Sequence, residues 1–171
     1  MYNLIDLLMV ILVVGIGATL VMDIWALFLQ RVLGIPSLSY CLVGRWISHM
    51  QHGIFSHPKI ADAEVQPGEC WLGWTTHYLI GIAYAALLLL VTQGAWVNWF
   101  ESNPLNAFFA ALAVGTATVV FPFFVMQPAL GFGIAASKNP KPGLARCKTL
   151  LTHCIFGMGL YFAGWLYHTL W

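Results

Sequence analysis

Charged side chains are scarce in this 171-residue chain, where Asp, Glu, Lys and Arg together make up 8% of the residues. A soluble globular domain carries about 25%, whereas this chain is 60% hydrophobic and has a mean hydropathy of +0.81. Seven basic and six acidic residues are too few to cover a water-facing surface, and the net charge of +1 lacks the basic excess used to bind nucleic acid. The composition therefore excludes a soluble enzyme and a nucleic-acid partner, and predicts a membrane protein whose first partner is the lipid bilayer.

Four long apolar runs occupy residues 4–29, 71–92, 104–127 and 149–170, approximately. About 20 apolar residues are enough for a helix to cross the hydrocarbon core, and the runs lack the alternation of a membrane β-strand. No basic residue precedes the first run and no small-residue cleavage site follows it, so we expect a membrane helix rather than a cleaved signal peptide. The sequence predicts an all-α, polytopic four-helix bundle that forms a single membrane domain over residues 1–171.

All seven basic residues fall in the two connections 30–70 and 128–148. Basic loops favour the cytoplasmic side, so we expect both connections in the cytoplasm and both termini outside. Within the first connection, residues 40–55 have helical periodicity, with Trp46 on the apolar face and Arg45 on the polar face. This pattern predicts an interfacial amphipathic helix between the first two membrane helices, with its polar side turned toward solvent and lipid headgroups.

The second and fourth membrane helices share a short pattern, T-H-x-x-x-G, which contains His77 in one and His153 in the other. In a similar way, Val-Met precedes Asp23 near the end of the first helix and Gln127 near the end of the third. The repetition predicts two tandem helical hairpins of the same orientation. The matches are short, and chance similarity is the alternative.

Asp23, His77, Gln127 and His153 lie toward the same end of the four predicted helices. An ionisable residue at the centre of a membrane helix costs about 2.5–3.5 kcal/mol on the insertion scale and usually faces the bundle interior. Each of the three ionisable residues also shares its helix face with small residues at four-residue spacing, which favours close helix contact. The sequence therefore predicts an interior polar layer in the cytoplasmic half of the bilayer.

Several functions are compatible with this layer. Asp23, His77 and His153 could hold a divalent metal such as zinc or non-haem iron, with Gln127 orienting the ligands. A haem b between the two histidines is less favoured, because no C-x-x-C-H attachment sequence is present and Asp23 would have no role. A proton relay in a small transporter component, working as a homodimer, is a further candidate.

The alternative from a different class is a structural or accessory membrane protein, in which the same side chains only bond one another. Whether the protein is an enzyme stays open.

A second cluster is predicted on the cytoplasmic face. Together with Gln127, the side chains of Arg45, His49 and Asn139 are candidates for binding a small molecule or an anionic lipid headgroup. A solvated face of the interfacial helix is the competing interpretation.

The cysteines carry no C-x-x-C pattern, which argues against a thiol–disulfide oxidoreductase. Because the cytoplasm is reducing, we expect Cys41, Cys70 and Cys147 to be free thiols.

Short motifs spread over nearly the whole chain are Gly17-Ala18-Thr19-Leu20-Val21-Met22-Asp23-Ile24-Trp25, Gly44-Arg45-Trp46 with His49, Gly73-Trp74 with His77-Tyr78, Met126-Gln127-Pro128 with Gly131 and Gly133, and Thr152-His153 with Gly157. In these motifs the chain resembles a family of small bacterial inner-membrane proteins described as a domain of unknown function. The resemblance implies four transmembrane helices and a bacterial plasma membrane, and it implies no particular activity.

Overall fold

The computed structural model describes residues 3–170, and every regular element in that range is helical, as predicted. The π-helical turn η2 (Pro122–Met126) follows the third long helix, and 3-10 turns η1 (Ile60–Asp62) and η3 (Ile134–Ala136) lie in the two long connections. The α-helices are α1 (Leu4–Val32), α2 (Tyr40–Met50), α3 (Glu69–Val91), α4 (Ala95–Ser102), α5 (Pro104–Ala117), α6 (Gln127–Ala129) and α7 (Pro142–Leu170).

Four helices are long and apolar enough to cross a membrane: α1, α3, the continuous stretch Pro104–Ala129 and α7. Between 22% and 28% of the residues in their most apolar windows are buried inside the protein. Many large apolar side chains on these helices are exposed, which is typical of helices packed in lipid. The predicted runs agree with these spans except at α7, which begins at Pro142 rather than at residue 149. Proline suits the first turn of a helix, so residues 142–148 extend α7 instead of forming a loop.

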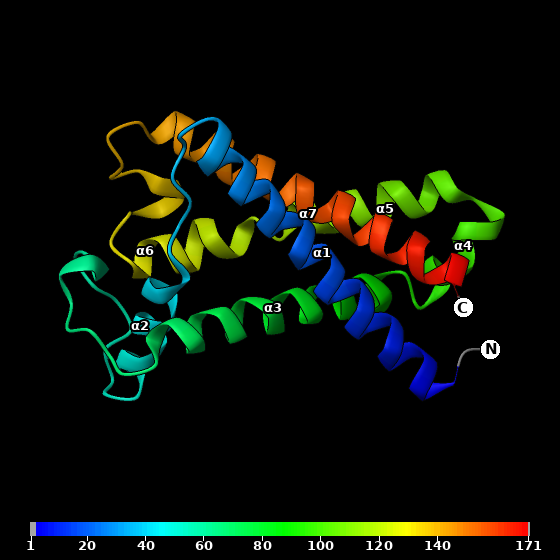
Figure 1. The fold of residues 1–171 in the computed structure, drawn as a ribbon, viewed down its shortest axis with the longest axis horizontal. Coiled ribbons are helices and arrows are strands. Elements are labelled where there is room, and N and C mark those ends of the chain that lie inside the picture. Colours follow the sequence, from blue (N-terminus) through cyan, green and yellow to red (C-terminus); the bar gives the residue numbers. More distant parts are fainter. Residues whose placement is uncertain (1–2, 171) are drawn as a thin grey trace.

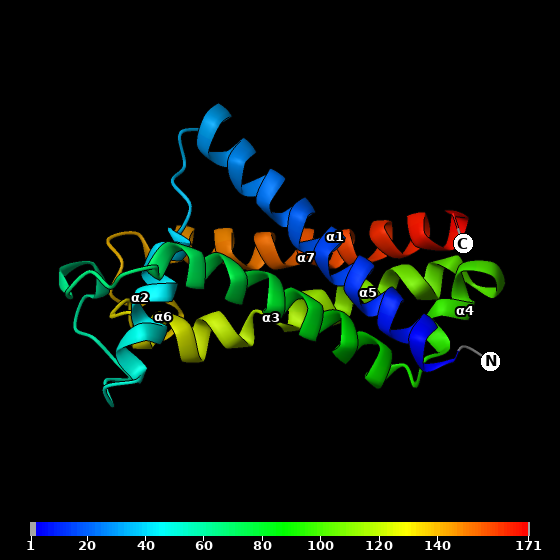
Figure 2. The same cartoon turned by 60° about the horizontal axis from the view of Figure 1, so that its bottom comes forward.

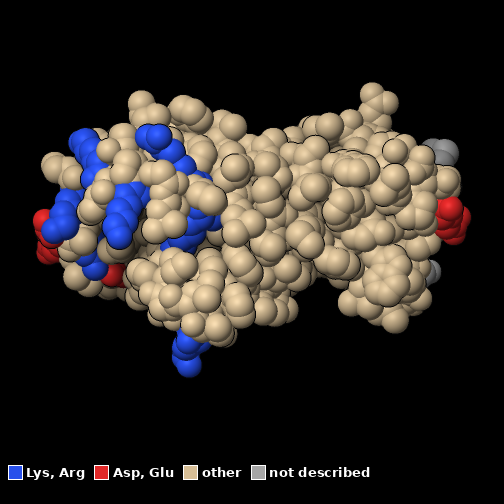
Figure 3. Space-filling model, turned by 90° about the horizontal axis from the view of Figure 1, so that it is seen from above, with Lys and Arg blue, Asp and Glu red and all other residues tan. Residues whose placement is uncertain are grey.

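The long helices run along the molecule, and both ends of the described chain lie at one end of the bundle (Figure 1). At the opposite end, α2 runs across the bundle and α1 diverges from α3 toward its own C-terminus (Figure 2). In the face seen in Figure 3, Lys and Arg side chains gather over the end that holds α2 and the connection before α7. We call this the basic end.

Helices α1 and α3 cross closely, as do α5 and α7. A Cβ atom added at Gly15 of α1 would overlap the backbone of Ile82 in α3, and one added at Gly115 of α5 would overlap the backbone of Gly157 in α7. Gly157 ends the second T-H-x-x-x-G pattern, and Gly81, which ends the first, lies at the α1–α3 crossing. Each of these glycines therefore lies where its helix crosses the other helix of the same pair, α1–α3 or α5–α7.

Candidate functional site

A cavity of about 900 Å³ lies at the basic end, between α1, α2, α3, η2 and α7. Its wall includes all four residues of the predicted polar layer and Asn139 from the connection before α7. Side chains from segments far apart in the sequence thus border one space, because the α1–α3 and α5–α7 hairpins pack side by side while α2 covers their end (Figure 2).

Asp23 and His77 meet on this wall. The Oδ1 atom of Asp23 lies 3.0 Å from Nε2 of His77, and the Tyr78 hydroxyl donates to Oδ2 of Asp23 at 3.0 Å. The ring of Tyr40, at the start of α2, stacks on the His77 ring with centroids 4.0 Å apart. Burial, followed by the nearby Asp23 carboxylate, raises the pKa of Tyr40, so its phenol stays protonated. The contacts with His77 and Tyr78 therefore engage both carboxylate oxygens of Asp23.

His153 lies on the same cavity wall but bonds a different partner. Its Nδ1 atom is 2.7 Å from the hydroxyl oxygen of Thr118, which itself donates to the backbone carbonyl of Gly115 at 2.6 Å. Thr118 lies where the regular α5 helix has ended, just before the π-helical turn that Pro122 begins. Sequence patterns do not indicate this partner, because a threonine in an apolar helix usually bonds only its own backbone.

Gln127 is 9% exposed and is the first residue of α6. Its Nε2 group donates to the Thr149 hydroxyl at 3.3 Å, and that hydroxyl donates to the Ala145 carbonyl at 2.9 Å. The Oε1 atom of Gln127 is buried and has no hydrogen-bond partner among residues 3–170. A buried acceptor without a donor is costly, and this atom is enclosed by the protein rather than open to the cavity.

The expected metal-ligand set of Asp23, His77 and His153 is not assembled as one group. Within the described part of the chain, no three His, Cys, Asp or Glu side chains are placed to hold a metal ion. Asp23 and His77 contact each other, whereas His153 is held by Thr118 on another helix.

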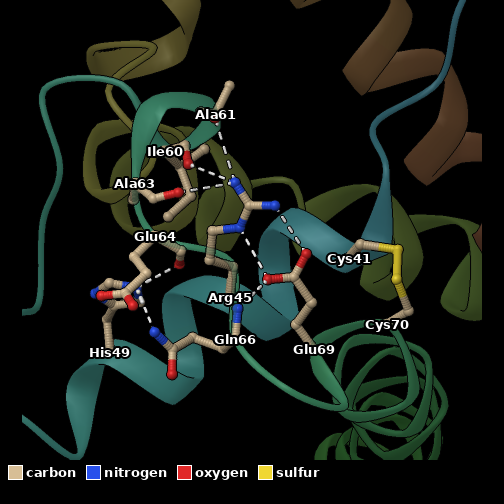
Figure 4. A network of polar contacts seen from close by, with 10 residues as sticks. All are labelled: Cys41, Arg45, His49, Ile60, Ala61, Ala63, Glu64, Gln66, Glu69 and Cys70. Carbon is tan, nitrogen blue, oxygen red and sulfur yellow. Dashed lines mark hydrogen bonds and ion pairs between the residues drawn. A yellow bond between two sulfur atoms is a disulfide. The ribbon is translucent and has the colours of Figure 1, made fainter.

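Arg45 occupies a position that differs from the prediction (Figure 4). Its side chain is not turned to headgroups but is buried, and it forms a bidentate ion pair with Glu69, with Nε–Oε2 at 2.9 Å and Nη2–Oε1 at 2.8 Å. Its Nη1 group donates to the backbone carbonyls of Ile60, Ala61 and Ala63. The Glu69 carboxylate raises the pKa of Arg45 above its ordinary value. With these donors engaged, the guanidinium is not free to bind an anionic headgroup.

His49 is buried beside Arg45 rather than solvated. Its Nε2 atom lies 3.0 Å from the Glu64 carbonyl oxygen and 3.3 Å from Nε2 of Gln66 (Figure 4). The ring of His57 packs edge-on against His49 at 4.9 Å, and burial followed by the nearby His49 lowers the pKa of His57. The polar face of α2 is therefore covered by the segment that leads to α3.

Cys41 and Cys70 form a disulfide between α2 and α3, so the expectation that both are free thiols is wrong. Gly44 and Gly73 bring the two helices into backbone contact at this place, which puts the cysteines three residues before each of them side by side. Cys147 is free and exposed, as expected.

A family model described as "Protein of unknown function (DUF2938)" matches residues 12–167. The chain belongs to this family. The match covers all the residues that border the cavity, and it agrees with the resemblance seen in the short motifs. Neither the curated proteins nor the solved structures contain a match to this DUF2938 protein.

Proposed function

We propose that this DUF2938 protein is a multi-pass membrane protein that binds a small ligand in the cavity at its basic end. One observation carries the proposal: Asp23, His77, Gln127 and His153, which come from separate parts of the chain, all border a single space of about 900 Å³. Ligand pockets in proteins typically measure about 300–1,000 Å³ and place a few polar groups in an apolar wall.

The rest of the wall supports an occupant with a mostly apolar body. Met22, Ile80, Tyr84, Phe121 and Phe156 border the cavity with carbon-rich side chains. Such a wall stabilises an apolar molecule by removing its surface from water, while the few polar groups fix its orientation.

We place the protein in a bacterial plasma membrane with the basic end in the cytoplasm and both termini outside. Support comes from the gathering of Lys and Arg at one end of the bundle and from the position of both termini at the other end (Figures 1 and 3). The ligand site would then lie in the cytoplasmic half of the bilayer.

An accessory membrane protein without a ligand is the second candidate. It is favoured by the bonding of Asp23, whose two oxygens are both satisfied by His77 and Tyr78. A polar cluster of this kind can hold helices together without any turnover.

A cavity-filling substitution separates the two candidates. Ala145 borders the cavity, whereas Ala113 lies exposed on α5, so Ala145→Trp puts a large side chain at the cavity wall and Ala113→Trp is the matched control. Each protein is incubated in nanodiscs with a total lipid extract and analysed by native mass spectrometry. We expect bound small molecules on the wild type and on Ala113→Trp, and their loss from Ala145→Trp.

Equal occupancy of the two variants would contradict ligand binding in the cavity. A wild-type protein that carries no adduct would favour the accessory role.

A further inference from the structure

Lys148 is the one lysine or arginine among the described residues that border the cavity. Its ammonium donates to the backbone carbonyl of Pro36, and both partners of this contact belong to the cavity wall. A lysine ammonium has three N–H donors and no acceptor. Within residues 3–170 its side chain makes no other hydrogen bond and no ion pair, so donors remain available to an occupant of the cavity.

Three neutral side chains with donors border the cavity in the connections at the basic end. Ser37 and Ser39 follow Pro36, and Asn139 precedes α7. Their side chains form no hydrogen bond with the rest of the described chain. We call Lys148, Ser37, Ser39 and Asn139 the donor cluster, because each has at least one unused N–H or O–H group.

The apolar part of the wall lies deeper in the bundle than the donor cluster. Phe156 follows Lys148 by eight residues in α7, which is about 12 Å along the helix axis. On the opposite wall, Met22 precedes the end of α1 at Val32 by ten residues, whereas Pro36 lies beyond that end. Both helices therefore place donors near the basic end and carbon-rich side chains further inside, an arrangement that suits an amphiphile with its polar head at the basic end.

The charge of the basic end favours a negative head. The connections 30–70 and 128–148 contain seven basic and three acidic residues. Two of the basic residues, Arg45 and Lys59, form ion pairs with carboxylates. Within the described part of the chain the others have no carboxylate partner: Arg31, Lys138, Lys141, Arg146 and Lys148. Lys and Arg gather at this end in Figure 3, and together they attract anions toward the cavity.

Asp23 is the acidic residue among the described residues of the cavity wall. It lies nine residues before the end of α1, in the deeper part beside Met22. His77 and Tyr78 engage its two oxygens, whereas Lys148 contacts the chain beyond α1. The negative charge of the wall is thus bonded within the protein, and the positive charge keeps free donors.

We infer that the cavity ligand is an anionic amphiphile. Its acidic headgroup, a carboxylate or a phosphate, accepts hydrogen bonds from the Lys148 ammonium, and its alkyl chain lies against the apolar wall. The inference rests on the proposed function, since it names the class of molecule that fills the same cavity. Hydrogen bonds between an ammonium and an anionic oxygen are about twice as strong as those between neutral groups, so charge sets the preference among amphiphiles of equal length.

The first test compares amphiphiles that share a dodecyl chain and differ in headgroup charge. Dodecyl phosphate is anionic, 1-dodecanol is neutral and dodecyltrimethylammonium is cationic. Each probe is mixed at the same mole fraction into phosphatidylcholine nanodiscs that hold the wild-type protein, and its occupancy is measured by native mass spectrometry. We expect dodecyl phosphate to bind on the order of tenfold more tightly than either of the other probes.

Substitutions assign this preference to Lys148. Lys148→Met removes the ammonium and keeps an unbranched chain, so we expect the preference to be lost, whereas Lys148→Arg keeps the charge and should retain it. Lys141→Met is the matched control, because it removes the same charge from an exposed position at the same end that does not border the cavity. It should bind the probes as the wild type does. Thermal unfolding shows whether each variant is folded, and the comparison of probes on the wild type needs no variant.

Two further probes identify the source of the negative charge. Binding of laurate as tightly as dodecyl phosphate would support a fatty acid as well as a phospholipid, and binding of dodecyl phosphate alone would support a phosphate headgroup. Inorganic phosphate lacks the alkyl chain, so an excess of it should leave dodecyl phosphate in place. Displacement by inorganic phosphate would overturn the amphiphilic character of the ligand.

The outcomes separate this inference from the proposed function. If the wild type binds the anionic, neutral and cationic probes equally, the charge inference is wrong while cavity binding stands. If no probe binds the wild type, and Ala145→Trp also leaves lipid occupancy unchanged, both are wrong. Equal losses in Lys148→Met and Lys141→Met would show that the anion is attracted by the surface of the basic end, and would overturn the role given to Lys148.

Discussion

At the scale of single residues, the contact between Asp23 and His77 is a polar interaction that links α1 to α3. The carboxylate also accepts from Tyr78, so three side chains depend on one another at the edge of the cavity. Removing the carboxylate leaves two partners unsatisfied, and a lost hydrogen bond to a partly buried donor costs roughly 1–3 kcal/mol.

We therefore predict that Asp23→Ala lowers the free energy of unfolding by about 1–3 kcal/mol, and that Asp23→Asn loses less because its side-chain oxygen can still accept from Tyr78. Thermal unfolding in detergent measures the effect. Asp62→Ala is the matched control, since Asp62 forms an exposed ion pair with Lys59, of a kind worth about 0–1 kcal/mol. Equal losses for Asp23→Ala and Asp62→Ala would show that the contact to His77 contributes nothing.

His57 gives a second residue-scale prediction, on pH. Burial and His49 lower its pKa in the folded state, so the unfolded chain binds a proton at a higher pH than the folded chain does. Its contribution to stability is therefore fully present above the unfolded pKa of about 6.5 and is lost as the pH falls from there toward the lowered folded value.

The measurement compares melting temperatures between about pH 5 and pH 7.5. The acid-induced decrease should be smaller in His57→Leu than in the wild type, and unchanged in His52→Leu, where the replaced side chain is exposed. Identical pH profiles for His57→Leu and the wild type would be inconsistent with a lowered pKa at His57.

Sequence patterns indicate the ionisable residues of the site, but they do not indicate the neutral side chains that bond them. Asp23, His77 and His153 stood out because a charge is rare in an apolar helix. Thr118 and Thr149 carry no such signal, and each becomes a site residue only through a partner that lies 35 or 22 residues away in the chain.

At the scale of helices, α2 shows where periodicity is informative and where it is not. The apolar face was assigned correctly, and Val43 and Trp46 pack into a small core with Leu130. The pattern predicts a solvated polar face, and this is wrong because an amphipathic pattern cannot distinguish water from a buried ion partner. Here the partner is Glu69, 24 residues further along the chain.

The crossing of α2 and α3 gives the element-scale prediction. A Cβ atom at Gly73 would overlap the backbone carbonyl of Tyr40, which can move only if α2 moves. We expect Gly73→Ala to destabilise the protein by about 1–3 kcal/mol, the usual cost of overpacking. Gly143→Ala, at a position with no atom within 4 Å of the added Cβ, should change stability by less than about 0.5 kcal/mol.

Circular dichroism melts of the two glycine variants are sufficient for this comparison. Comparable melting temperatures for Gly73→Ala and Gly143→Ala would show that the helices can separate without cost.

At the scale of the whole molecule, two general rules disagree about which side the basic end faces. Basic residues favour the cytoplasm, whereas the Cys41–Cys70 disulfide at the same end is typical of an oxidising compartment. The helix positions could be predicted from length and hydropathy, but the disulfide could not, because it depends on how closely two helices cross.

Accessibility labelling in cells decides the orientation. In a Cys154→Ala background, we expect Asn98→Cys, in α4 at the opposite end, to react with a membrane-impermeant maleimide in intact cells. The native Cys147, which is free and exposed at the basic end, should react only after permeabilisation and serves as an internal control. The reverse pattern would put the basic end outside and the disulfide in the oxidising compartment.

The bond between Cys41 and Cys70 also limits how a molecule can enter or leave the protein. Because a disulfide ties α2 to α3, these two walls of the cavity move together. They cannot separate to let a molecule pass between them. The cavity is also bordered by η2, by α7 and by the end of α1, which diverges from α3 (Figure 2). In the connection after α1, the Pro36 carbonyl accepts a hydrogen bond from Lys148 of α7. We therefore expect a ligand to move between the cavity and the bilayer beside the last turns of α1.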